Sequence, residues 1–219
     1  MQRFKFDRDR HRFLVSHALL RCVLSCYAET APEKWCFVVG PHGKPALAPT
    51  LQGVNFNLSH SGSYALLALS TGCELTGVDI ERHRSTRDFH ALARRKFAPL
   101  EAKRLRLLSG VQLVAEFHDT WTLKEAFVKA TGEGLSRSLA HFHFDIDRSN
   151  GLLVFSARPE LESDPGLWRF WCYRPDRTCS AALALRVSDH AMGTEAPLWF
   201  DMVPLQGWDA RDVPWLLRS

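Results

Sequence analysis

Gly77-Val78-Asp79-Ile80-Glu81 is the stretch of sequence that decides the fold. Its apolar and acidic residues alternate, which is the period-two pattern of a β-strand with one buried face and one polar face. Asp79 and Glu81 therefore share the polar face, roughly 7 Å apart along the strand. Two carboxylates at this spacing repel each other unless water or a cation lies between them, and Mg²⁺ prefers oxygen ligands. The stretch predicts a strand that carries a metal site.

A further acidic position lies on a predicted helix that begins near Trp121. The run Trp-Thr-Leu-Lys-Glu-Ala-Phe-Val-Lys-Ala at residues 121–130 has apolar residues at helical spacing. Glu125 and Lys129 are four residues apart and share a neighbouring face of this helix. Taken singly, the pair is also typical of a surface ion pair worth about 0.3 kcal/mol. We expect Glu125 to join the two strand carboxylates as a third ligand.

These two motifs, about forty residues apart, resemble the paired signature of the Sfp-type 4′-phosphopantetheinyl transferases. Upstream lie two further matches, Phe-Asn-Leu-Ser-His-Ser-Gly at residues 56–62 and Gly-Lys-Pro at residues 43–45. The resemblance runs from about Arg3 to about Ala184 and covers most of the chain. It implies an α+β fold with two similar α/β subdomains related by a pseudo-twofold axis, and an active site in the cleft between them.

The resemblance also implies an activity. This activity is the Mg²⁺-dependent transfer of the 4′-phosphopantetheine moiety of coenzyme A to a serine of an acyl or peptidyl carrier protein, with release of adenosine 3′,5′-bisphosphate. It assigns metal binding to Asp79, Glu81 and Glu125, and catalysis to Glu125, Lys129 and Asp79. The positions implied for binding coenzyme A are Arg12, Gly43, Lys44, Pro45, Ser59, His60, Asp79 and Lys129.

The residues by themselves leave other functions open. Two acids on a strand and one on a helix occur in other metal-dependent phosphotransferases and in nucleases, which would act without coenzyme A. A catalytically silent binding protein of the same fold is a second alternative. Ser59 and His60 do not indicate a hydrolase, because adjacent residues point apart and no Gly-x-Ser-x-Gly motif is present. His141 and His143 share a predicted strand face but lack a third ligand nearby.

Local patterns divide the chain into two predicted helix-then-sheet units, residues 1–79 and 80–187, and a C-terminal tail, residues 188–219. The first unit has a helix ending near Tyr27 and strands near residues 35–39, 54–58 and 64–69, with a polar loop at 59–63. The second has helices near residues 88–97, 99–108 and 111–130, followed by strands, with Asn150-Gly151 as a hairpin turn. The tryptophans of the tail are expected to anchor it to the body.

The first predicted helix supplies both Arg12 and an apolar face. Arg12 matches the family position near the nucleotide of coenzyme A. The apolar face is expected to pack against the body, and its members are Phe13, Leu14, Leu20, Val23 and Leu24.

The segment that follows Glu81 is the most basic one near the predicted site. Only Asp88 opposes its cations, which are Arg82, Arg84, Arg87, Arg94, Arg95 and Lys96. The resemblance implies that the carrier protein docks beside the active site along this segment, and because acyl carrier proteins are typically acidic, opposite charge should speed the encounter. Phe89 or Phe97 would supply an apolar contact there unless it faces the core.

The composition of the 219-residue chain is that of a folded globular protein, with 46% hydrophobic and 24% charged residues. A net charge of +4 is mild and does not require a nucleic-acid partner. The six cysteines form no Cys-x-x-Cys motif, the charged N-terminus does not resemble a signal peptide, and no apolar run approaches the ~20 residues of a membrane span. We expect a cytoplasmic monomer that binds neither nucleic acid nor a membrane.

Overall fold

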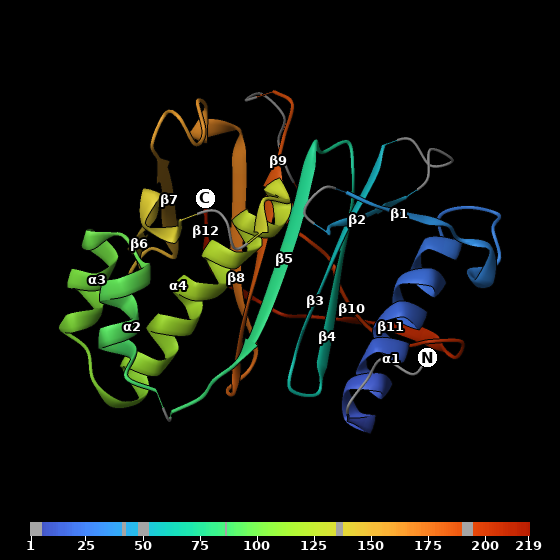
Figure 1. Cartoon of the computed structure of the whole chain (residues 1–219), viewed down its shortest axis with the longest axis horizontal. Helices are drawn as coiled ribbons and strands as arrows, with labels where there is room; N and C mark the ends of the chain where they lie inside the picture. The colour runs from blue at the N-terminus through green and yellow to red at the C-terminus, as the bar shows by residue number, and fades with distance from the viewer. Residues whose placement is uncertain (1–5, 41–42, 48–52, 86, 135–137, 190–194) are drawn as a thin grey trace.

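The acidic stretch forms strand β5 (Leu75–Arg82), which lies where the N-terminal and C-terminal parts of the molecule meet (Figure 1). This computed structural model describes residues 6–40, 43–47, 53–85, 87–134, 138–189 and 195–219. The described helices and strands form a mixed α+β fold with a central mixed sheet. No helix in these ranges is long and apolar enough to cross a membrane.

The N-terminal part consists of one long helix packed on antiparallel strand pairs. Its elements are α1 (Asp7–Ser25), η1 (Pro32–Lys34), β1 (Phe37–Val39), β2 (Pro45–Leu47), β3 (Val54–Ser61) and β4 (Tyr64–Thr71). β1 pairs with β2, and β3 pairs with β4 over its whole length. Leu20 and Leu24 of α1 are buried against Trp35 and Phe56. One face of the β3–β4 hairpin therefore belongs to the core under α1.

The C-terminal part is built around a six-stranded sheet in the order β5-β9-β8-β12-β7-β6. Its helices are α2 (Phe89–Lys96), α3 (Pro99–Arg106), α4 (Gly110–Thr131), η3 (Leu139–His141) and η4 (Pro165–Leu167). Its strands are β6 (Phe142–Asp147), β7 (Leu152–Ala157), β8 (Trp168–Asp176), β9 (Cys179–Arg186) and β12 (Trp215–Arg218). β12 runs parallel to β7 and the other neighbours are antiparallel, so the sheet is mixed.

α4 crosses one face of this sheet and forms the main core with it (Figure 1). The aromatic residues of that core include Phe127, Phe144, Phe155 and Phe170. α2 and α3 pack beside the N-terminal half of α4. The opposite face of the sheet is covered from β4 and from the tail, which adds the separate hairpin of β10 (Trp199–Val203) and β11 (Gly207–Arg211). α4 is therefore held on the sheet along most of its length.

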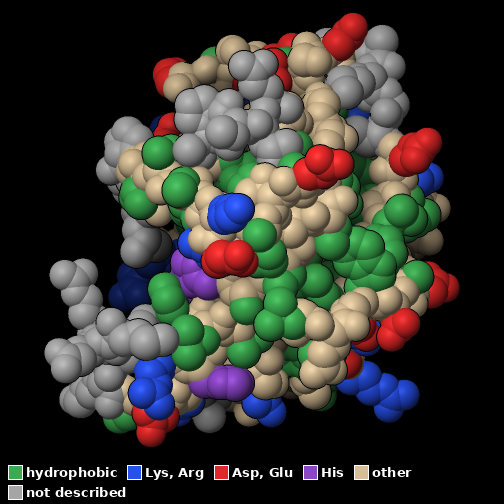
Figure 2. Space-filling view, turned by 90° about the vertical axis from the view of Figure 1, so that its right-hand side faces the viewer, with side chains coloured by type: hydrophobic (Ala, Val, Ile, Leu, Met, Phe, Trp, Pro, Cys, Tyr) green, Lys and Arg blue, Asp and Glu red, His purple; other side chains and the backbone are tan. Residues whose placement is uncertain are grey.

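The predicted helices and most predicted strands are confirmed, with ends within a few residues. The Asn150-Gly151 hairpin is also confirmed, because β6 pairs with β7 around Gly151, which has a φ of 67°. Three expectations were wrong. Residues 59–61 belong to β3 and not to a loop. Phe13 and Leu14 are not buried against the body, since they are 43% and 42% exposed, and the Phe13 ring contacts that of His17 on the same helix. Hydrophobic side chains are visible on the side of the molecule where α1 lies (Figure 2).

The third expectation, that tryptophans anchor the C-terminal tail, was wrong only in part, because Trp199 does pack against Tyr173 of β8, with ring centroids 4.8 Å apart. The tail is not merely attached to the body by its tryptophans, because β12 is an interior strand of the sheet between β8 and β7. Leu217 is fully buried in the main core, whereas Trp208 and Trp215 are exposed. The fold therefore uses the tail as a structural strand.

Candidate functional site

Gly77 allows α4 to lie directly on the acidic strand. A Cβ at this position would lie 2.1 Å from the carbonyl oxygen of Ala126 and 2.4 Å from the amide nitrogen of Ala130, closer than real Cβ atoms approach other atoms. The facing residues of β9, Ala182 and Ala184, are small and buried as well. The last turns of α4 are thereby placed over Asp79, and the glycine of the motif has a packing role.

Asp79, Lys129 and Ser59 meet at the centre of the site. The Lys129 ammonium lies 2.6 Å from Oδ1 of Asp79 and 2.7 Å from Oγ of Ser59, and the Ser59 hydroxyl donates to the same Oδ1 over 2.8 Å. Asp79 is only 4% exposed, and its second oxygen, Oδ2, is buried without a hydrogen-bond partner in the described structure. A buried carboxylate oxygen without a partner is costly, so this atom points to a ligand.

The three carboxylates carry more negative charge than Lys129 can balance. Burial raises the pKa of Asp79, although Lys129 opposes this shift. Burial, and then the charges of Asp79 and Glu81, raise the pKa of Glu125 to about 7. Glu125 can therefore accept or release a proton near neutral pH.

The donor set fits a hard divalent cation, although it is not closed around one. Within the described ranges, no three His, Cys, Asp or Glu side chains converge so that they could hold a metal. In this arrangement the Lys129 ammonium lies against Asp79 instead. Carboxylate oxygens in a negatively charged, buried position, one of them unpartnered, are nevertheless the ligands that Mg²⁺ prefers. The assignment of Mg²⁺ to Asp79, Glu81 and Glu125 stays a prediction.

Polar side chains of β3 hold the free edge of β5. The amides of β5 that point away from β9 donate to alternate residues of β3, and the pairs are Val78 with Asn57 (2.9 Å), Ile80 with Ser59 (3.3 Å) and Arg82 with Ser61 (3.0 Å). The Ser61 hydroxyl also donates to Oε2 of Glu81 over 2.8 Å. Sequence reasoning missed Ser61, and the only signal was the alternation of polar residues from Asn55 to Ser61.

Lys44, from the N-terminal part, contacts the last turn of α4. Its ammonium donates to the carbonyl oxygens of Ala130 (2.8 Å) and Thr76 (3.1 Å), which is a favourable position for a cation at a helix C-terminus. Burial lowers the pKa of Lys44 to about 8. Gly43, with a φ of 85°, and Pro45, the first residue of β2, flank it in exposed positions. Lys44 thus lies next to the acidic strand.

Of the other residues expected to bind coenzyme A, Arg12 and His60 lie on the α1 side of the β3–β4 hairpin, and Ser59 lies on the opposite side, toward Asp79. Arg12 is on α1 and pairs with Asp9 over 3.0 Å. His60 is exposed, and it lies on the face of β3 opposite to Ser59 because side chains alternate along a strand. Ser59 itself accepts hydrogen bonds from Lys129 and Ile80 and donates one to Asp79, which uses its full capacity.

The lysine that precedes Glu125 has a structural role. Lys124 is fully buried and forms an ion pair with Glu101 of α3 at 2.8 Å. Its ammonium also donates to the carbonyl oxygens of Leu139 and Phe142. Burial lowers its pKa to about 8. Of the two lysines in the helix motif, Lys124 anchors α4 to its neighbours and Lys129 faces the acids.

A cavity of about 100 Å³ adjoins the acidic strand. Its lining combines aromatic and aliphatic side chains with three arginines, and the residues are Glu81, Arg82, Arg84, Arg87, Phe89, Leu92, Phe117, His118 and Trp121.

Phe89 and Phe97, which were expected to contact a carrier protein unless they face the core, are both buried in the core between α2 and α4. Neither is therefore an exposed contact for a partner. Arg94, Arg95 and Lys96 are exposed in the last turn of α2.

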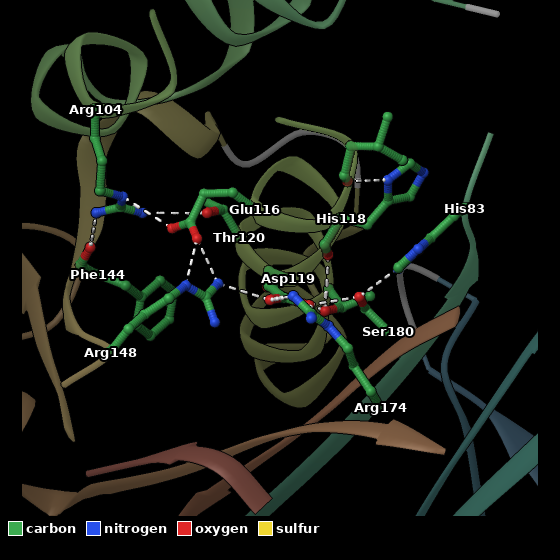
Figure 3. Close-up of polar contacts among 12 residues, drawn as sticks. His83, Arg104, Glu116, His118, Asp119, Thr120, Phe144, Arg148, Arg174 and Ser180 are labelled. Carbon is green, nitrogen blue, oxygen red and sulfur yellow. Dashed lines mark hydrogen bonds and ion pairs between the residues drawn. The ribbon is translucent and has the colours of Figure 1, made fainter. Parts of the chain in front are cut away.

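A second polar cluster lies farther toward the N-terminus of α4 (Figure 3). Asp119 is fully buried and accepts from Arg148 (2.7 Å), Arg174 (2.6 Å) and Ser180 (2.5 Å). Glu116 pairs with Arg148 and, at 3.0 Å, with Arg104 of α3. We call these residues the Asp119 cluster. It joins α4 to β8, β9 and the turn after β6.

Comparison with known proteins adds independent information. The model of the 4′-phosphopantetheinyl transferase superfamily matches residues 76–186, and that of the 4′-phosphopantetheinyl transferase N-terminal region matches residues 1–72. The 4′-phosphopantetheinyl transferase HetI of Nostoc sp. is 34% identical over 185 residues, which are 84% of this chain and 74% of HetI.

Two other relatives show how far sequence identity and coverage vary among the matches. The putative 4′-phosphopantetheinyl transferase slr0495 of Synechocystis sp. is 39% identical over 139 residues, which are 63% of this chain and 56% of that protein. The human L-aminoadipate-semialdehyde dehydrogenase-phosphopantetheinyl transferase is 30% identical over 219 residues, 93% of this chain and 70% of the human protein. The chain thus spans little more than half the length of slr0495 and about three quarters of HetI.

Proposed function

Because this chain belongs to the 4′-phosphopantetheinyl transferase superfamily, we propose that it transfers the 4′-phosphopantetheine arm of coenzyme A to a serine of an acyl or peptidyl carrier protein. The products are the holo carrier protein and adenosine 3′,5′-bisphosphate. In this reaction the serine Oγ forms a bond to the β-phosphorus of coenzyme A. The bond from that phosphorus to the oxygen bridging to the α-phosphate breaks, and the serine proton is lost.

One observation carries this proposal, which is the state of Asp79. Its carboxylate is buried on the strand, one oxygen is bound by Lys129 and Ser59, and the other has no partner in the described structure. Phosphoryl transfer depends mainly on positioning and on charge neutralisation. A buried acid with a free oxygen beside a lysine and two further acids supports such chemistry at this position.

The roles of the other residues follow from their places. Lys129 offsets negative charge on the transferred group, and Glu125 takes the serine proton, for which its raised pKa of about 7 is suitable. Asp79, Glu81 and Glu125 would hold Mg²⁺, which, when bound, supplies charge neutralisation to the diphosphate oxygens. Lys44, with Gly43 and Pro45 beside it, is proposed to contact coenzyme A from the N-terminal part. Arg12, Ser59 and His60 complete the proposed binding set.

We also propose the finer features that the sequence predicted. In each half of the molecule one long helix packs on antiparallel strands, α1 on β3–β4 and α4 on β8–β9, which supports a pseudo-twofold relation between two subdomains. The six cysteines are free thiols, as expected in the reducing cytoplasm. We propose a cytoplasmic monomer without nucleic-acid or membrane partners, and light scattering of the purified protein measures its oligomeric state.

The experiment that tests the function is a mass measurement. Apo carrier proteins of the fatty-acid, polyketide and nonribosomal-peptide types are incubated with coenzyme A, Mg²⁺ and the purified protein. We expect at least one carrier to gain the mass of one phosphopantetheine group, and the gain to require both coenzyme A and Mg²⁺. Hydrolysis of nucleic acid or of simple phosphate esters, with every carrier unmodified, would instead support the phosphotransferase or nuclease alternative.

A further inference from the structure

Two serines of β3 make the same pair of hydrogen bonds to β5. The Oγ of Ser59 accepts from the amide of Ile80 and donates to the carboxylate of Asp79. Two residues along, the Oγ of Ser61 accepts from the amide of Arg82 and donates to the carboxylate of Glu81. Each serine therefore binds one backbone amide of β5 and the carboxylate of the residue immediately before that amide.

The geometry fixes the direction of these hydrogen bonds. A serine hydroxyl has one proton and two acceptor lone pairs. Because the backbone amide of Arg82 can only donate, it occupies an acceptor position of Ser61, and the single proton of Ser61 is available to Oε2 of Glu81 at 2.8 Å. Ser61 is buried, so solvent offers this proton little competition. The hydroxyl thereby holds the Glu81 carboxylate in one orientation.

We propose that Ser61 is a positioning residue, which holds Glu81 in the orientation that binds the divalent cation. This inference rests on the proposed function, because it gives Glu81 its task as a metal ligand. Lys129 and Ser59 already hold Asp79, whereas Ser61 is the only described residue with a hydrogen bond to the Glu81 carboxylate. The N-terminal hairpin therefore helps to set the cation site of the C-terminal part.

The same ladder contains a matched control. Asn57 accepts the amide of Val78 over 2.9 Å, as Ser61 accepts that of Arg82. The residue before Val78 is Gly77, which has no carboxylate to orient. Asn57→Ala and Ser61→Ala each remove one acceptor from a β5 amide, but only Ser61→Ala also frees an acid. A purely structural role of Ser61 would make the two variants alike.

The test measures cation binding directly. Mn²⁺ takes the same oxygen ligands as Mg²⁺, and its free concentration is followed by electron paramagnetic resonance as the protein is titrated in the presence of coenzyme A. We expect Ser61→Ala to raise the apparent Kd for Mn²⁺ about tenfold, as is typical when a partner that orients a metal ligand is lost. Ser61→Thr, which keeps the hydroxyl, should bind like the wild type, and Asn57→Ala should bind like the wild type as well.

Turnover provides a second readout and separates the two proposals. With a carrier, Ser61→Ala should need more Mg²⁺ for half-maximal activity while KM for coenzyme A stays unchanged. Equal Mn²⁺ affinity in folded Ser61→Ala and wild type would overturn the role of Ser61, even if the wild type transfers phosphopantetheine. Weakened Mn²⁺ binding without any transfer by the wild type would support Ser61 and refute the proposed function. If Ser61→Ala does not fold, Ser61→Cys, of similar size but with a weaker donor, carries the same comparison.

Discussion

Two clusters of carboxylates lie along α4, the Asp119 cluster and the candidate site that Glu125 of α4 forms with Asp79 and Glu81 of β5, and they are neutralised in opposite ways. In the Asp119 cluster, two acids face three arginines, with Ser180 as a further donor to Asp119 (Figure 3). At the candidate site, the ion pair of Asp79 with Lys129 is the one that the described residues show for the three acids Asp79, Glu81 and Glu125. One end of the helix has a surplus of cations, and the other has a surplus of acids.

This difference distinguishes an architectural cluster from a functional one. Buried carboxylates that stabilise a fold are paired, because an unpaired buried charge costs several kcal/mol. The acids of the candidate site instead leave Oδ2 of Asp79 without a partner and raise the pKa of Glu125 to about 7. Such a site is destabilised until a cation or a proton arrives. The comparison therefore predicts that mutations in the two clusters have opposite effects on stability and activity.

The largest expected effect is on catalysis. Glu125→Gln keeps the shape of the side chain but removes the proton acceptor and a metal ligand, so we expect kcat to fall by about 10³-fold. The melting temperature should stay the same or rise, because a carboxylate with unfavourable neighbours is lost. The control is Glu116→Gln on the same helix, which should lose stability and keep its turnover per folded molecule. Near wild-type kcat in Glu125→Gln at saturating Mg²⁺ would rule out this role.

The next effect is on stability. Asp119→Ala removes the carboxylate partner of Arg174 and leaves Arg148 paired with Glu116 alone, and we expect a loss of about 3 kcal/mol in the free energy of unfolding, measured by urea titration. For a chain of this size that corresponds to a fall of about 6–12 °C in Tm. Asp119→Asn keeps the volume and should lose less. A change below about 1 kcal/mol would show that the cluster contributes little to the fold.

The third effect is a dependence of stability on pH in the metal-free protein. Glu125 has a pKa of about 7 in the folded state against an ordinary value of 4.5, so the folded state binds more protons between these values. Protonation of Glu125 therefore contributes on the order of 1–3 kcal/mol to the free energy of unfolding. This contribution is fully present below pH 4.5 and is lost as the pH rises to about 7. His83, with a pKa lowered to about 4, has the opposite trend.

The difference between the wild type and Glu125→Gln isolates the carboxylate from the histidines. We expect the wild type to lose stability relative to Glu125→Gln as the pH rises from 4.5 to 7, measured by urea titration with a chelator present. Parallel pH curves for the two proteins would contradict the raised pKa. Addition of Mg²⁺ at pH 7 should restore part of the difference, since a ligand of the folded state stabilises it.

The sequence allowed these two clusters to be predicted to different degrees. The alternation at β5 and the helical spacing of Glu125 and Lys129 correctly placed these residues on a strand and a helix, because both patterns are local. The position of Ser61 beside Glu81 depends on how β3 lies against β5, and its polar neighbours resemble a loop. Asp119 draws its partners from Arg148, Arg174 and Ser180, far along the chain, and no motif marks such contacts.

The strand β12 could not be predicted from the sequence either, because it also depends on contacts with residues far away along the chain. Its few residues gain their stability from insertion between β7 and β8, with Leu217 in the main core, and a four-residue segment carries little pattern of its own. Gly77 is the reverse case. The sequence shows that the motif contains a glycine, but only the packing of α4 against β5 explains why a glycine is required there. Its missing Cβ is needed because the backbone of α4 lies against it.

The smallest expected effect extends the comparison to charges that are not buried. Arg94 and Arg95 are exposed in the last turn of α2, the helix whose Phe89 and Leu92 line the cavity beside Glu81. Screening within about 8–10 Å limits what exposed charges contribute. An acidic carrier protein would still be attracted toward them at low salt. The variant Arg94→Glu/Arg95→Glu should raise KM for the carrier several-fold and flatten its salt dependence, while KM for coenzyme A stays unchanged.

The matched control for that variant is Lys103→Glu/Arg106→Glu in the last turn of α3. It makes the same change in net charge and places the same acids near a helix C-terminus, where they cost about 0.3–1 kcal/mol each. If the carrier docks along α2, only the α2 variant should change KM for the carrier. Equal effects of the two variants would instead indicate long-range attraction by the overall charge, without docking at α2. If neither variant changes KM for the carrier, the carrier docks elsewhere, and the exposed hairpin of β10 and β11 is the next surface to test.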